Sequence, residues 1–219
     1  IDSVRGKDAH DSLIRLFEEH RIDILVGTQM LVKGLDFEKV QLVGILDADS
    51  LLNFSDFRVN ERAFQLMEQV SGRAGRKDQR GQVLVQVAET GHPVLHYLQT
   101  HDYINFYNQE IMERQAFQYP PFSRFMRISF RHRYTDIVQE ASRFFAERLQ
   151  SGYAQFMIGP AEPVVNRVRN QYIMELSLKL PRDAGIQKNC KDLIRNAIAQ
   201  LHFEKRFRSV LVLPDVDAV

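Results

Sequence analysis

The sequence has 219 residues, of which 44% are hydrophobic and 26% charged, a composition typical of a folded soluble protein. It lacks an apolar run of about 18 residues and begins with neither a signal nor a transit peptide, which excludes a membrane protein and predicts a cytoplasmic location. The single cysteine, Cys190, excludes an internal disulfide or Cys-based zinc site, and its helical apolar neighbours predict a core position. Because the chain begins with Ile1 rather than Met, we expect an excised fragment of a longer protein.

Charge is divided unevenly along the chain. Residues 1–120 carry 13 Lys and Arg against 18 Asp and Glu, whereas residues 121–219 carry 16 against 10. This asymmetry suggests an anionic partner for the second half, although a solvated basic surface explains it equally well.

The first half alternates helical and strand patterns. We expect helices over 11–19, 61–70 and 103–114, with Asn60 capping the second, and strands over 22–26, 40–46 and 82–87. Strands separated by helices predict a parallel α/β sheet. Pro120 and Pro121 prevent the last helix from continuing, so we place the domain boundary there and expect domains 1–116 and 117–219.

The second half has a different order of elements. Strands are expected over 125–132, 157–168, 171–180 and 209–213, and helices over 135–150 and 183–202. This βαββαβ order predicts a ferredoxin-like domain, and hence an α/β plus α+β chain. Each helix has one apolar stripe, so the sheet should have one covered and one open face. The stripes comprise Ile137, Ala141, Phe144 and Phe145, and Ile186, Cys190, Leu193, Ile194, Ala197 and Leu201.

An arginine-rich string, Gln69-Val70-Ser71-Gly72-Arg73-Ala74-Gly75-Arg76, follows a predicted helix. Arginine stays charged and offers forked donors to phosphate oxygens, while glycine allows close backbone approach. The string therefore predicts an anion-binding site, with a solvated, glycine-capped helix end as the alternative.

A second string, from Val26 to Phe37, follows a predicted strand, where α/β sheets place ligand sites. Its polar side chains can contact phosphate, sugar or an arginine; they are Thr28, Gln29, Lys33 and Asp36. Gly27 and Gly34 are the other candidate residues of the string. Taken singly, Lys33 and Asp36 are also typical surface residues. The phosphate-binding string Gly-x4-Gly-Lys-Ser/Thr is absent from the sequence, so these residues cannot bind and hydrolyse ATP alone.

The two strings together resemble motifs V and VI of superfamily 2 helicases. Further matching strings are Leu46-Asp47-Ala48-Asp49, Asp56-Phe57-Arg58, Glu61-Arg62, Tyr119-Pro120-Pro121-Phe122, Gly159-Pro160-Ala161 and Asp215-Val216-Asp217. With these strings the whole chain resembles the PriA family of replication-restart DNA helicases, also called primosomal protein N′.

The resemblance implies the C-terminal part of an ATP-dependent 3′→5′ DNA helicase that binds stalled or branched forks and restarts replication by primosome assembly. In this family ATP and Mg²⁺ bind between two RecA-like lobes, and residues 1–116 would be part of the second. Arg76, then Arg73, would be the catalytic finger, with Gln69, Gly72 and Gly75 beside the nucleotide. Gly27, Thr28, Gln29, Lys33, Gly34 and Asp36 of the second string would couple ATP to DNA.

The resemblance also implies branched and single-stranded DNA, the acidic tail of single-stranded DNA-binding protein, and primosome proteins as partners. The family's zinc-binding cysteines precede motif V and are missing from this sequence, so we expect no zinc and no other cofactor in the fragment. The fragment alone should be inactive, because it lacks the P-loop.

The basic second half offers two groups of candidate contacts for DNA or an acidic peptide. Strand periodicity places Arg127, Arg131 and Arg133 with Lys179 on the open face, and the last helix carries Lys188, Lys191 and Arg195. A solvated basic face is the alternative. The open face has few aromatic residues, so base stacking of the RNA-recognition kind is not expected. The histidines show no metal-binding spacing.

A different class of function stays open. The chain would then be a self-contained nucleic-acid or acidic-peptide binding module without motor activity, and the arginines of the Gln69–Arg76 string would have a structural role.

Overall fold

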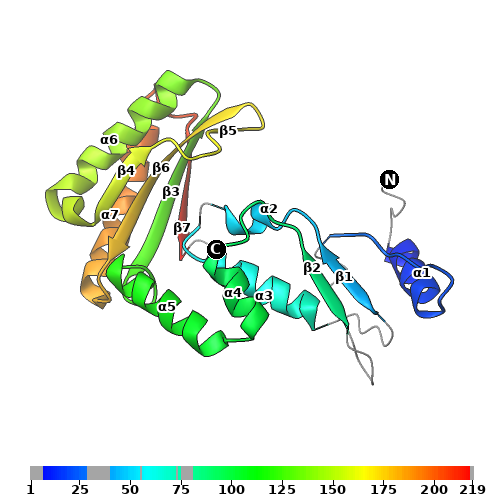
Figure 1. Ribbon diagram of the computed structural model, residues 1–219. Helices are drawn as coiled ribbons and strands as arrows, with labels where there is room; N and C mark the ends of the chain where they lie inside the picture. Colours follow the sequence, from blue (N-terminus) through cyan, green and yellow to red (C-terminus); the bar gives the residue numbers. More distant parts are fainter. Residues whose placement is uncertain (1–6, 29–39, 55, 73, 75–80, 218–219) are drawn as a thin grey trace. The chain divides into compact units, whose positions relative to one another are not determined.

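The computed structural model describes residues 7–28, 40–54, 56–72, 74 and 81–217. The chain forms two compact units (Figure 1). The first contains residues 1–54 and 59–102, and the second contains residues 55–58 and 103–219. The short segment 55–58 therefore belongs to the second unit, although residues of the first unit flank it in the sequence.

A parallel pair of strands with helices forms the first unit. Its elements are α1 (Lys7–Glu18), β1 (Leu42–Ile45), α2 (Asp49–Leu52), α3 (Val59–Ser71), β2 (Gln82–Val85) and α4 (Pro93–Thr100). β1 and β2 pair in parallel, from Leu42 with Gln82 to Ile45 with Val85, as the alternating pattern predicts. Their core includes Ala48, Phe64, Met67, Val94 and Leu98.

Two local expectations for the first unit are wrong. Residues 22–26 form no strand; Ile24 and Val26 are 77% and 82% exposed, so neither pairing nor burial stabilises an extended ladder there. Asn60 does not cap α3 from outside, because the helix already begins at Val59. The turn before α3 is instead closed by Asp56, whose Oδ1 accepts a hydrogen bond of 2.9 Å from the Arg58 amide.

The second unit contains an antiparallel sheet and three long helices. Its elements are α5 (Tyr103–Ala116), β3 (Arg124–His132), α6 (Thr135–Tyr153), a short 3₁₀ helix (Ala154–Phe156), β4 (Met157–Ala161), β5 (Arg167–Val168), β6 (Gln171–Leu180), α7 (Ala184–Phe203) and β7 (Leu211–Val216). The strand order is β4-β6-β3-β7, with β5 paired to β6. The predicted order of strands and helices after Pro121 is therefore present.

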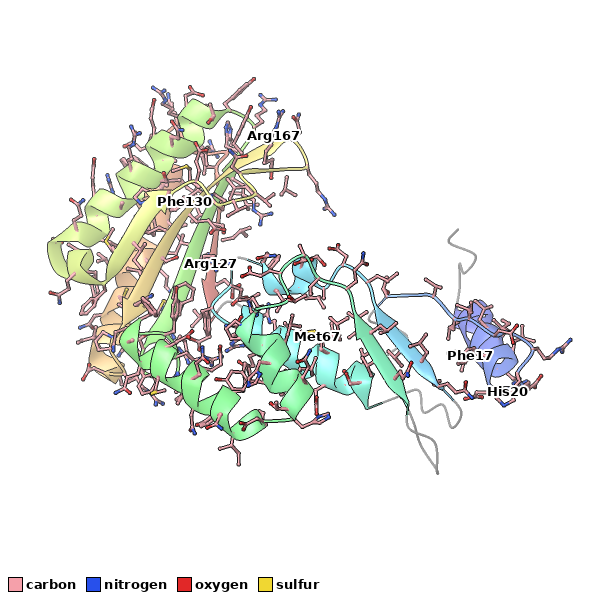
Figure 2. The ribbon with its side chains drawn as sticks, in the orientation of Figure 1. Phe17, His20, Met67, Arg127, Phe130 and Arg167 are labelled. Carbon is pink, nitrogen blue, oxygen red and sulfur yellow. The ribbon has the colours of Figure 1, made fainter. Side chains whose placement is uncertain are left out.

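The core of the second unit lies between the sheet and helices α6 and α7 (Figures 1 and 2). Ile128 and Phe130 of β3 and Leu176 and Leu178 of β6 are fully buried in it. Phe130 meets Phe145 of α6 edge to face, with ring centroids 5.2 Å apart. Arg127 lies on the opposite face of β3 from Phe130 (Figure 2). Strand alternation and the helical stripes correctly predicted this core.

Cys190 of α7 is completely buried in the same core, as predicted. Burial raises the pKa of its thiol to about 11, because the thiolate would lose its hydration. The thiol is therefore protonated near neutral pH and contributes through packing.

The face of the sheet opposite the helices is not fully open. Phe125, at the start of β3, is 5% exposed on that face. The rings of Phe57 and Tyr119 lie 5.8 Å from its ring and cover this end of the sheet. The expectation of one wholly open face is therefore wrong at the Phe125 end, because two aromatic residues outside the sheet pack there.

The strand expected over 157–168 is interrupted after Ala161. The pairing of β4 with β6 shifts register between Ile158 and Ala161, and Gly159 has φ +95°. A Cβ atom at position 159 would lie 2.8 Å from the Glu175 carbonyl oxygen. The bulge therefore requires glycine, for both its backbone conformation and its close contact with β6.

Gly159→Ala should consequently lower the free energy of unfolding by roughly 1–3 kcal/mol, the usual cost of a side chain in such a conformation. Gly152→Ala is the matched control, since nothing lies within 4 Å of its added Cβ and helix α6 favours alanine. Chemical denaturation of both variants measures the difference. Equal stability of the two variants would contradict the requirement for glycine at position 159.

Candidate functional site

The arginine-rich string begins at the C-terminal end of α3. Gln69 is exposed on the last turn, the Gly72 amide donates to the Glu68 carbonyl at 3.0 Å, and the Ala74 amide donates to the Ser71 carbonyl at 3.1 Å. The described part of the string is thus a helix end followed at once by a turn. Arg73, Gly75 and Arg76 lie outside the described residues.

Only the beginning of the second string is described. Gly27 and Thr28 are exposed and follow the unpaired segment 22–26. The predicted Gln29, Lys33, Gly34 and Asp36 lie outside the described residues. Their expected roles therefore stay predictions.

The carboxyl end of β1 is organised by Asp49. Its Oδ2 accepts a hydrogen bond of 2.8 Å from the Ala88 amide, just beyond β2, and the buried Ala48 donates from its amide to the Gln86 carbonyl at 3.0 Å. The Leu46–Asp49 string thus connects the ends of the two parallel strands. The carboxyl ends of strands are where open α/β sheets place ligand sites.

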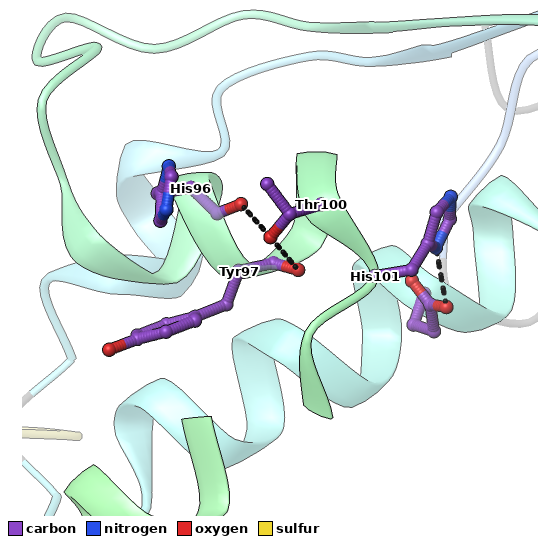
Figure 3. Close-up of polar contacts among 5 residues, drawn as sticks. His96, Tyr97, Thr100 and His101 are labelled. Atoms are coloured by element: carbon purple, nitrogen blue, oxygen red, sulfur yellow. Dashed lines mark hydrogen bonds and ion pairs between the residues drawn. The ribbon is translucent and has the colours of Figure 1, made fainter. Parts of the chain in front are cut away.

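Helix α4 meets the end of α3 through His101 (Figure 3). His101 has φ 53° and its Nδ1 lies 3.1 Å from Oε1 of Glu68, four residues before Gly72. The preceding turn is closed by Thr100, whose hydroxyl donates to the His96 carbonyl at 2.9 Å. The side chains of His101 and Glu68 are 71% and 41% exposed, so we expect the pair to orient the helix end more than to stabilise it.

Aromatic rings and cations form a cluster in the second unit that sequence reasoning missed. Phe57 stacks on Tyr119, with centroids 5.0 Å apart and planes 9° apart, and both rings contact Phe125. The guanidinium carbons of Arg58 and Arg114 lie 5.1 and 5.5 Å from the Phe57 centroid. Sixty residues separate the Asp56-Phe57-Arg58 string from the Tyr119-Pro120-Pro121-Phe122 string in the sequence. No local sequence pattern therefore indicated that the two strings are in contact.

Lys179 belongs to this aromatic cluster. Its Nζ donates to the Phe117 carbonyl at 2.7 Å and lies 3.6 Å from the Tyr119 centroid. Burial lowers the pKa of the Lys179 ammonium from its ordinary value. Lys179 therefore has local partners that satisfy its charge, which leaves it less available to an external anion than the sequence predicted.

The three predicted arginines of β3 have different surroundings. Arg127 Nε lies 3.8 Å from Oε2 of Glu175, and Arg133 lies over the Tyr134 ring at 4.8 Å. Arg131 Nε is buried without a hydrogen-bond partner among the described residues. Arg127, near the middle of β3, is therefore paired with a carboxylate, whereas Arg131 and Arg133, at and just beyond the end of the strand, form no ion pair with any residue that the structure describes.

The last helix presents the other predicted basic group at its surface. Lys188 and Arg195 are exposed and Lys191 is partly buried, on the side of α7 away from Cys190 and Ile194. Arg195 Nη1 pairs with Asp192 Oδ1 at 2.8 Å, in an exposed contact that solvent screens strongly. This group remains accessible to an anionic partner.

The described histidines have local structural contacts. Nδ1 of His92 accepts from the Val94 amide at 3.3 Å and caps α4, and Nε2 of the buried His132 lies 3.1 Å from Oγ of Ser209. Within the described part of the chain, His, Cys, Asp and Glu side chains form no group that could hold a metal ion. None of the helices in that part is long and apolar enough to cross a membrane.

Two family models match the chain. The helicase conserved C-terminal domain matches residues 1–78, and the primosomal protein N C-terminal domain matches residues 115–219. The first match includes the arginine-rich string and the second includes the antiparallel sheet, and neither includes residues 79–114.

Curated relatives match over most of the chain. It is 39% identical to the replication restart protein PriA of Chlamydia trachomatis, covering 100% of this chain and 28% of the relative. The corresponding protein of Bacillus subtilis is 32% identical, covering 99% and 26%. That of Synechocystis sp. is 39% identical, covering 82% and 22%. The chain therefore spans about a quarter of the length of these curated relatives.

Phe57→Leu should lower the free energy of unfolding of the second unit by roughly 1–2 kcal/mol, because it removes the stacked and edge-on ring contacts. Hydrogen exchange of the β3 amides should accelerate, although position 57 is far from β3 in sequence. Phe54→Leu is the control, since Phe54 is 65% exposed. If both variants exchange alike, the cluster does not stabilise β3.

Proposed function

Because this chain belongs to the PriA family of replication restart proteins, we propose that it is the C-terminal part of an ATP-dependent 3′→5′ DNA helicase that binds stalled or branched forks. Restart by primosome assembly would be the role of the whole protein, in the cytoplasm. The single observation that carries the proposal is the end of α3. The helix leads directly into Gly72-Arg73-Ala74-Gly75-Arg76, within the residues that match the helicase C-terminal domain.

In this proposal the first unit is part of the second RecA-like motor lobe. The parallel pairing of β1 and β2 with helices around it supports this assignment. Arg76, or else Arg73, would reach the γ-phosphate from the end of α3, where the forked donors of arginine offset developing charge. Gln69 and Gly72 would line the nucleotide, and the string that begins at Gly27 and Thr28 would couple it to DNA.

ATP and Mg²⁺ would bind in the whole protein, where another lobe supplies the phosphate-binding loop, and zinc would bind in a segment upstream of motif V. The sequence contains no Gly-x4-Gly-Lys-Ser/Thr string, and its single cysteine cannot build a cysteine zinc site. The fragment would therefore carry neither a cysteine-ligated zinc ion nor a complete ATP site.

The second unit is proposed to be a ferredoxin-like domain that contacts DNA and protein partners. Its strand order β4-β6-β3-β7, with two helices on one face, supports the fold. The balance of 16 basic to 10 acidic residues after Pro120 supports an anionic partner. Branched and single-stranded DNA, the acidic tail of single-stranded DNA-binding protein, and primosome proteins are the partners we infer. We propose the domain boundary between residues 116 and 117, at the end of α5, whereas α5 itself belongs to the second compact unit.

A self-contained nucleic-acid or acidic-peptide binding module is the alternative. The match of residues 1–78 to a helicase domain favours the motor instead.

The 219-residue chain alone should show no DNA-stimulated ATP hydrolysis, because it lacks the loop that holds the phosphates. Phosphate release measured with and without single-stranded DNA tests this expectation. Turnover that copurifies with the chain through successive chromatographic steps would contradict it.

Arg76→Ala in the whole protein should lower ATP turnover by roughly 10³–10⁵-fold, the usual contribution of an arginine finger. Arg76→Lys should also be poor, because a point charge does not reproduce the forked contact. Melting temperature and DNA binding should stay close to those of the parent. Arg80→Ala, four residues beyond the string, is the matched control.

A structural role for Arg76 predicts a different result. The alanine variant would then lose melting temperature and activity together. Near-normal turnover in a well-folded Arg76→Ala protein would remove Arg76 from catalysis and make Arg73 the next candidate.

A further inference from the structure

The last turn of α3 is held differently from the rest of the helix. The buried residues of α3 are Ala63, Phe64 and Met67, so no residue after Met67 is fully buried in the core of the first unit. Polar contacts to neighbouring elements therefore have more influence on the direction of this turn, Glu68 to Ser71, than on the rest of the helix. The arginine-rich string begins within the same turn, at Gln69.

Glu68 makes such a polar contact with the end of α4 (Figure 3). Nδ1 of His101 lies 3.1 Å from Oε1 of Glu68, and because an ionised carboxylate only accepts hydrogen bonds, Nδ1 is the donor. The other carboxylate oxygen, Oε2, is buried and has no hydrogen-bond partner among the described residues. A carboxylate that is partly removed from water depends more strongly on the partners that remain to it.

His101 ends α4 in a left-handed conformation, with φ 53° and ψ 31°. Its amide donates to the Leu98 carbonyl at 3.3 Å, and the Asp102 amide donates to the Tyr97 carbonyl at 3.0 Å. Glycine or asparagine usually occupies this position after a helix. Glycine would end α4 as well but could not reach Glu68. What histidine adds over glycine is therefore the contact with α3.

We propose that His101 is a positioning residue for ATP hydrolysis, which acts through Glu68 to fix the direction in which α3 leads into the arginine-rich string. The inference rests on the proposed function, because it requires that the string acts on nucleotide. The Glu68 carbonyl accepts the Gly72 amide at 3.0 Å, so the residue that His101 holds by its side chain also contacts the string by its backbone. A misplacement of about 1 Å can cost roughly 100-fold in rate. A weak, exposed pair can therefore affect turnover while adding little to stability.

Two substitutions at position 101 separate this role from that of ending α4. Asparagine and glycine both accommodate a positive φ, but only asparagine has a side-chain nitrogen as many bonds from the backbone as Nδ1. In the 219-residue chain, hydrogen exchange of the Gly72 and Ala74 amides should be about 2- to 5-fold faster in His101→Gly, the range expected for an exposed polar pair. Exchange in His101→Asn should stay close to that of the parent, and both variants should keep the melting temperature.

In the whole protein, His101→Gly should lower the kcat of ATP hydrolysis roughly 10-fold and change the KM for ATP by less than about 2-fold, because a misdirected arginine loses interactions made in the transition state. His101→Asn should restore most of this turnover. In a Glu68→Ala background, His101→Gly should cause no further loss, since the contact is already absent. Thr100→Ala is the control, because the bond from its hydroxyl to the His96 carbonyl lies within α4 and does not involve α3.

The outcomes separate this inference from the proposed function. Parent-like turnover in His101→Gly, in a protein that Arg76→Ala inactivates, rejects only the role of His101. Equal losses in His101→Gly and His101→Asn, or a similar loss in Thr100→Ala, would assign the effect to the end of α4 and would also overturn it. If the whole protein hydrolyses no ATP, or keeps its turnover in both Arg76→Ala and Arg73→Ala, the proposed function fails and the positioning role fails with it.

Discussion

The second unit depends on the stacking of Phe57 on Tyr119. The two rings cover Phe125, the first apolar residue of β3 on the face away from the helices, and thereby close one end of that face. Arg58 and Arg114 approach the Phe57 ring, so the cluster combines apolar burial with attraction between cations and ring faces. Because Phe57 comes from a segment flanked on both sides by the first unit, the start of β3 requires a distant part of the chain.

Lys179 shows how this cluster accommodates a charge. Removing the ammonium from water is costly and lowers its pKa, yet the Phe117 carbonyl and the Tyr119 ring face it directly. The hydrogen bond from Lys179 to the Phe117 carbonyl therefore links β6 to the segment that follows α5. On the same face, Nε of Arg127 lies 3.8 Å from Oε2 of Glu175, so this charge is also compensated within the sheet.

Local periodicity predicted much of the fold, and its failures have physical causes. The alternation of Ile128 and Phe130 with Arg127 identified the buried face of β3, and the stripe through Cys190 identified that of α7. Residues 22–26 have a strand-like composition, but pairing decides whether a strand forms, and composition does not reveal a partner. Similarly, Gly159 gave no local sign of the bulge that ends β4. The site was harder to predict, because both partners of Lys179 come from segment 117–119, which no spacing rule connects to β6.

Helix α3 lies between Phe57 of the aromatic cluster and most of the arginine-rich string in the sequence. Phe57 lies two residues before α3, and the arginine-rich string begins in the last turn of the same helix. Thirteen helical residues span about 20 Å at 1.5 Å per residue, and their hydrogen bonds make the element stiff along its axis. Within the first unit, Glu68 and His101 meet near the C-terminal end of α3. The aromatic cluster and the residues proposed to act on nucleotide thus belong to different compact units, although Phe57 and Arg76 are only 19 residues apart in the sequence.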